Sequence, residues 1–164
     1  MWGFMIICYL CMVISCILLI ITGLQGYFQF MILKASHQQF ALFSTIFYMF
    51  SETLIMFFFI GSGTAIKKEV TQSNIPTSAY DKVKRTKMIL FPHLTLNMLL
   101  VGVVFILGGA VQTGFISGMV HGVLFIITFF HFLYTILVQH IGFKENVDLV
   151  IELANLHETK SLLS

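Results

Sequence analysis

Residues 118–141 read GMVHGVLFIITFFHFLYTILVQHI, an almost unbroken apolar stretch that carries three histidines. A helix of this length can cross the hydrocarbon core of a bilayer. Its hydrogen-bonding side chains recur three and four residues apart and so share one face of the helix: Ser117, His121, Thr128, His131 and Thr135. Ionisable side chains at membrane depth are costly against lipid, so this face is expected to look into a protein interior and to mark a functional site.

The composition extends this interpretation to the whole chain of 164 residues. It is 58% hydrophobic and only 10% charged, whereas soluble domains average about a quarter charged. Four segments are long enough to span a membrane, at about 2–24, 39–65, 88–111 and 116–141. We therefore predict an all-α, polytopic integral membrane protein, a four-helix bundle that forms a single domain.

The basic residues predict how the bundle is oriented. Most of them lie between the second and third spans, in a segment expected to be a loop over residues 66–87: Lys67, Lys68, Lys82, Lys84, Arg85 and Lys87. The positive-inside rule places this loop and both termini in the cytoplasm. We expect the loop to contact anionic lipid headgroups and no nucleic acid, and the protein to reside in a bacterial inner membrane.

Three local features complete the expected fold. Pro92, early in the third span, predicts a bend just before His93. His37 falls in an aromatic-rich turn between the first two spans, where we expect it to be exposed. After the fourth span, residues 147–156 form a short amphipathic pattern that Asn146 can cap. We expect this C-terminal helix to lie along the cytoplasmic interface or to dock a partner.

Glu52 is the only carboxylate at membrane depth. At about 1.5 Å of rise per residue, Glu52 and His131 both fall within a few Å of the middle of their spans. A carboxylate alone at that depth must be protonated or paired. We therefore predict a hydrogen bond between Glu52 and His131, with Asn97 and Thr128 in reach, as the polar core of the bundle.

Other polar side chains extend this core in both directions. Tyr48, Thr45 and His121 continue it toward the outside, and His93 continues it toward the cytoplasm. Such a ladder suits a pathway for protons or a cation. The structural alternative is a buried polar pair that only fixes the register of the helices.

Two cofactors are compatible with the ladder. A metal site needs about three ligands at one depth, and Glu52, His131 and Met56 are the candidates, with copper favoured by the soft thioether. Haem b needs one or two histidines, for which the candidates are His93, His131 and His140. No spacing typical of a nucleophilic triad stands out, so no catalytic residue is assigned.

A short part of the chain resembles cytochrome oxidase subunit III. The segment 51–58 places a Ser-Glu pair ahead of a Met/Phe run, and His121-Gly122 matches the start of that family's His-Gly-x-His motif, with Leu124 in place of the second histidine. The resemblance implies association with respiratory subunits, where Glu52 would influence proton uptake or lipid binding in a partner oxidase.

These observations predict an accessory or carrier component of a membrane redox system, associated with other membrane subunits or with copies of itself. One alternative is a transporter or channel-like module for protons or a cation. The other is a membrane enzyme that binds haem or a metal.

Overall fold

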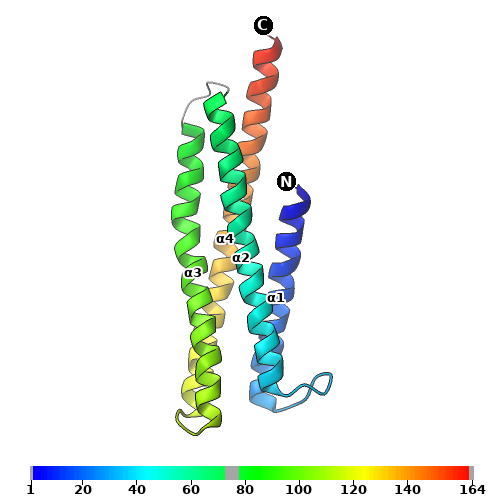
Figure 1. Ribbon diagram of the computed structural model, residues 1–164, viewed down its shortest axis with the longest axis vertical. Coiled ribbons are helices and arrows are strands. Elements are labelled where there is room, and N and C mark those ends of the chain that lie inside the picture. The colour runs from blue at the N-terminus through cyan, green and yellow to red at the C-terminus, as the bar shows by residue number, and fades with distance from the viewer. Residues whose placement is uncertain (1, 73–77, 163–164) are drawn as a thin grey trace.

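The computed structural model describes residues 2–72 and 78–162, without the side chains of 78, 79 and 157–162. It consists of four helices, α1 (Trp2–Phe28), α2 (His37–Gln72), α3 (Ser78–Gln112) and α4 (Gly118–Leu162) (Figure 1). All four are long and apolar enough to cross a membrane. The predicted all-α bundle of four candidate membrane spans is therefore confirmed.

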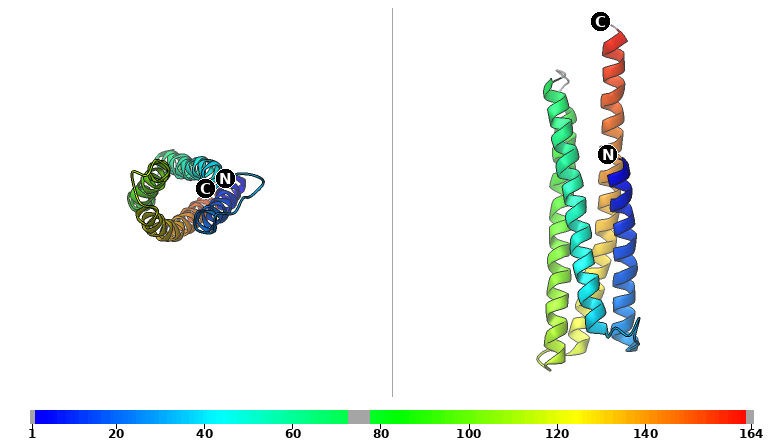
Figure 2. Two further views of the ribbon diagram at one scale, coloured as in Figure 1. Left: turned by 90° about the horizontal axis from the view of Figure 1, so that it is seen from below. Right: turned by 45° about the vertical axis from the view of Figure 1, so that its right-hand side comes forward.

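Consecutive helices run in opposite directions and surround a shared interior (Figures 1 and 2). Helix α2 packs against α1 and α3, and α3 packs against α4, whereas α4 touches α1 only lightly. Because α1 is the shortest helix, the other three extend beyond it at the end where both termini lie (Figure 1). We call this the basic end, since residues 67–72 and 78–87 lie there, and the end with the connections 29–36 and 113–117 the opposite end.

Apolar side chains cover the outside of the bundle and polar side chains fill much of its inside. Large hydrophobic residues such as Ile7, Phe57, Ile106 and Phe130 are exposed. The buried polar residues come from all four helices: Ser15, Thr22, Gln25, Ser44, Ser51, Glu52, Ser62, Asn97, Thr128, Thr135, Gln139 and Asn146. This distribution is the reverse of that in a soluble protein and fits a hydrocarbon surround.

Small hydroxyl residues form the contact between α1 and α2. Ser15 Oγ donates to Ser51 Oγ and Thr22 Oγ1 donates to Ser44 Oγ, and the two oxygens are 2.9 Å apart in each pair. The two pairs lie seven residues apart on both helices, so they repeat on the same face two turns apart. Small polar residues at such an interface let helix backbones approach closely within a membrane.

The predicted bounds of the loop, residues 66–87, are wrong, because α2 continues to Gln72 and α3 already begins at Ser78. The separate C-terminal helix 147–156 is likewise wrong, since these residues belong to α4. Their apolar face packs against α2 and α3 in one cluster of Ile66, Val70, Val83, Leu149 and Leu153. An amphipathic pattern suits a membrane surface and a helix partner equally well, and here the partners are α2 and α3. Pro92 lies inside helix α3, which does not end there. The bend expected before His93 stays a prediction.

Leu149→Asp is expected to open this three-helix extension. Leu149 is 3% exposed, and a buried charge without a partner is strongly destabilising. The ion pair between Lys82 Nζ and Glu152 Oε2, which are 2.8 Å apart, is exposed and therefore stabilises the extension too little to offset this loss. Limited trypsin digestion should cleave the variant after Lys67 and Lys68 at least about tenfold faster than the wild type, because cleavage of a helix requires local unfolding.

Ile151→Asp is the matched control, because Ile151 is an exposed apolar residue two positions further along α4. Its cleavage rate should match that of the wild type. Equal acceleration in both variants would show that added charge alone, and no packing contact of Leu149, controls the cleavage.

Candidate functional site

A line of polar side chains runs through the interior between α2 and α4, which point in the same direction (Figure 1). Residues 84 positions apart face each other across it, as Tyr48 packs against Phe132 and Ser62 bonds to Asn146. We call this set the polar row: His37, Tyr48, Glu52, Ser62, Asn97, His121, Thr128, His131, Thr135, Gln139 and Asn146. It extends from the opposite end of the bundle to the basic end.

The amide of Asn97 joins three helices near the middle of the row. Its Nδ2 donates to Tyr48 Oη over 2.7 Å, and its Oδ1 lies 2.8 Å from His131 Nδ1. A carbonyl oxygen only accepts, so this bond assigns the proton to Nδ1 of His131 and leaves a lone pair on Nε2. Asn97 thereby fixes the orientation of the imidazole from α4 against the phenol from α2.

Glu52 is 1% exposed and takes its hydrogen bond from another residue than predicted. Gln139 Nε2 donates to Glu52 Oε2 over 2.5 Å, and Glu52 Oε1 has no partner among the described residues. The predicted hydrogen bond between Glu52 and His131 is therefore wrong, because each of the two groups is bonded elsewhere. Both nevertheless belong to the same interior row, together with Asn97 and Thr128.

The physical reason is the register of α2 against α4. Glu52 and His131 are 79 positions apart in the sequence, whereas facing residues are 84 apart. Glu52 therefore lies about five positions, or about 7.5 Å, nearer to the basic end than His131 does. The predicted metal ligands Glu52, His131 and Met56 consequently do not meet at one depth, and Met56 packs against an apolar cluster.

Several buried polar atoms of the described chain have no hydrogen-bond partner within the protein. Six of these seven atoms belong to α2 or α4: His37 Nδ1, Glu52 Oε1, His121 Nδ1, Thr128 Oγ1, Gln139 Oε1 and Asn146 Oδ1. The seventh is Gln25 Oε1 on α1. Buried polar groups are normally satisfied by protein or by ordered water. The row is thus a series of positions that can bind water.

The row meets a charged cleft at the basic end. Asn146 Nδ2 donates to Ser62 Oγ over 3.0 Å, and Asn146 also lines a cleft of about 340 Å³. The charged residues around this cleft are Lys82, Arg85, Lys87, Glu145, Asp148 and Glu152. This cleft provides a polar opening at the basic end of the row.

An aromatic layer separates Glu52 from that opening. It consists of Phe58, Phe59 and Phe143, whose ring centroids lie 5.0–5.3 Å apart. Gly142 leaves room for the layer, since a Cβ at this position would lie 3.1 Å from Phe59 Cζ. Glu52 therefore has polar neighbours toward the opposite end and an apolar barrier toward the basic end.

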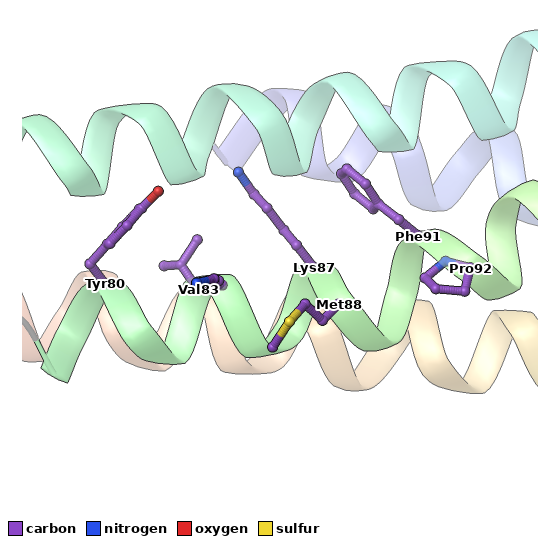
Figure 3. A pocket seen from close by; sticks show the side chains of 7 residues that line it. Tyr80, Val83, Lys87, Met88, Phe91 and Pro92 are labelled. Atoms are coloured by element: carbon purple, nitrogen blue, oxygen red, sulfur yellow. The ribbon is translucent and has the colours of Figure 1, made fainter.

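A second pocket, of about 490 Å³, lies along α3 and is separate from the polar row. Figure 3 shows Tyr80, Lys87 and Phe91 pointing from α3 toward α2. The remaining lining residues are Val83, Lys84, Met88 and Pro92. Since this lining contains neither a carboxylate nor a histidine, the pocket offers no continuation of the Glu52 site.

The structure brings two of the three predicted haem ligands together. The rings of His93 and His131 lie 5.8 Å apart between centroids, and Tyr134 lies 5.0 Å from His93 and 6.4 Å from His131. Tyr134 is exposed, and both histidines are half-buried. His140 belongs to another contact, since its Nδ1 lies 2.9 Å from Tyr9 Oη on α1. It therefore does not join the other two histidines.

Of the remaining pathway candidates, Tyr48 and His121 belong to the row and Thr45 does not, and sequence reasoning missed some members of the row. Tyr48 is buried, while Thr45 and His121 are half-buried nearer the opposite end. Gln139 was missed although it follows Thr135 by four positions and so continues the same helix face. His37 was expected to be exposed, yet its Nδ1 is buried.

The fold and the site together define a class, a small polytopic helical membrane protein with a buried carboxylate and histidines in a polar interior row. Comparisons of the chain with protein-family models, with curated proteins and with solved structures find no significant match. The resemblance to oxidase subunit III is thus confined to short motifs.

Proposed function

We propose that this protein moves protons along the polar row, with Glu52 as the group that binds and releases them. The observation that carries the proposal is a fully buried carboxylate with one amide donor and one unpartnered oxygen. A permanent charge with so little compensation is costly inside a membrane. A carboxyl group that alternates between its protonated and ionised forms avoids that cost for part of each cycle.

The two sides of Glu52 suggest how a proton travels. Toward the opposite end, Thr128, His131 and Tyr48 provide hydroxyl and imidazole groups that can relay protons through water. Toward the basic end, the aromatic layer blocks access to Asn146 and the charged cleft. Transfer to the basic end therefore requires this layer to move, as in a carrier whose site opens to one side at a time.

Orientation follows from the charge distribution under this proposal. The basic end carries most of the lysine and arginine residues, so the positive-inside rule favours the cytoplasmic side for it. A bacterial inner membrane stays part of the proposal. His37 and His121 would then face the outside. Protons would enter near these histidines and leave through the charged cleft.

The proposal is tested by reconstituting the purified protein in liposomes that enclose a pH-sensitive dye. A potassium gradient with valinomycin sets an inside-negative potential, and we expect the lumen to acidify faster than in protein-free liposomes. Equal rates with and without protein, at both signs of the potential, would exclude proton movement by the protein alone.

The second candidate function is that of a subunit in a membrane redox assembly. It rests on the cluster of His93, His131 and Tyr134, which is partly open to the outside of the bundle. Polar groups that face lipid are costly, so this surface suits another membrane subunit, a second copy of the chain, or bound haem b or copper. Copurification with an oxidase, or a Soret band or bound copper in the purified protein, would support this role. Loss of the bound oxidase, haem or copper in His93→Leu would assign the role to this cluster.

A further inference from the structure

Three buried polar atoms without a hydrogen-bond partner lie at the opposite end of the bundle, and each can act as an acceptor. They are His37 Nδ1 from the first turn of α2, His121 Nδ1 from the first turn of α4, and Gln25 Oε1 from the last turn of α1. The three atoms are buried and come from three different helices. A group of buried acceptors without a donor is expected where a protein binds a cation.

The two imidazoles are held in place by glycines of neighbouring helices. A Cβ at Gly26 of α1 would lie 3.0 Å from Cε1 of His37, and a Cβ at Gly108 of α3 would lie 3.3 Å from Cε1 of His121. Each ring therefore rests directly on a backbone. His37 and His121 are 84 positions apart, the spacing at which residues of α2 and α4 face each other.

A hydrogen bond orients one of the three acceptors. Gln25 is fully buried, and its Nε2 donates to the carbonyl of Ala35 over 3.0 Å. This bond holds the amide so that Oε1 remains free to accept.

We propose that His37, His121 and Gln25 form a binding site for a divalent transition-metal ion, with Zn²⁺ as the probe. Two imidazole nitrogens and one amide oxygen suit a borderline ion, and water would complete a tetrahedral shell. The site lies beside the connection 29–36, at the opposite end of the bundle (Figure 1). A bound ion would link α1, α2 and α4 at the mouth of the polar row.

The test is a Zn²⁺ titration of the full chain in nanodiscs, after purification without a polyhistidine tag, in competition with a chromophoric chelator. We expect one Zn²⁺ per chain and at least about tenfold weaker binding in His37→Ala and in His121→Ala. His140→Ala is the matched control and should bind like the wild type, because His140 is exposed and contacts Tyr9. Absence of binding, or equal affinity in all three variants, would overturn the proposal.

Two further measurements keep the test decisive if an alanine variant unfolds. His37→Asn and His121→Asn retain a polar amide in place of the imidazole, and Zn²⁺ should raise the Tm of the wild type clearly more than that of these variants. A Co²⁺ titration should also give the visible absorption of a nitrogen-ligated ion in the wild type alone. Since none of these measurements uses a proton gradient, Zn²⁺ binding can be lost or kept independently of proton flux.

Discussion

Glu52→Gln is expected to abolish proton flux while the bundle remains folded. Glutamine can still accept the hydrogen bond from Gln139 Nε2 but cannot take up or release a proton at accessible pH. In the liposome assay, the potential-driven rate of lumen acidification should fall at least about tenfold, to the rate of protein-free liposomes. Helix content and Tm should stay close to those of the wild type, because removing a buried titratable group relieves a desolvation cost.

Asp81→Asn is the matched control for this substitution. Its carboxylate is exposed in the first turn of α3 and does not line the charged cleft. Its proton flux should equal that of the wild type. A Glu52→Gln variant that retains full flux would show that the buried carboxylate only stabilises the fold.

Asn97→Leu is expected to lower the stability of the bundle. Leucine fills a similar volume but leaves both Tyr48 Oη and His131 Nδ1 without their partner. Hydrogen bonds between membrane helices contribute about 1–2 kcal/mol, and unpaired buried groups add desolvation cost. We expect the free energy of unfolding to fall by about 1–3 kcal/mol, measured by reversible denaturation in mixed micelles.

Thr95→Leu provides the comparison, because Thr95 is an exposed polar residue on the same helix two positions earlier. Exchanging it for leucine on the lipid-facing side should change stability by less than about 0.5 kcal/mol. If both variants were equally stable, the Tyr48–Asn97–His131 connection would make no net contribution to the bundle.

The amino-acid sequence by itself determined the four spans and several of the polar side chains that lie inside. Long apolar runs and the three-and-four spacing of polar residues are local properties, so they can be read without knowing any helix contact. They correctly placed Glu52, Asn97 and Thr128 in the interior. They also marked His131 as facing other helices, where it bonds to Asn97.

The tertiary structure alone decided which of these groups meet. Spacing fixes the face of a helix but not its offset along a neighbouring helix, because that offset depends on contacts such as Gly142 with Phe59 and Gly108 with His121. Because Glu52 lies about five positions nearer to the basic end than His131, it accepts a hydrogen bond from Gln139 and not from His131. The same long-range packing joined residues 147–156 to α2 and α3, and brought His37 and Gln25 to the end where His121 lies.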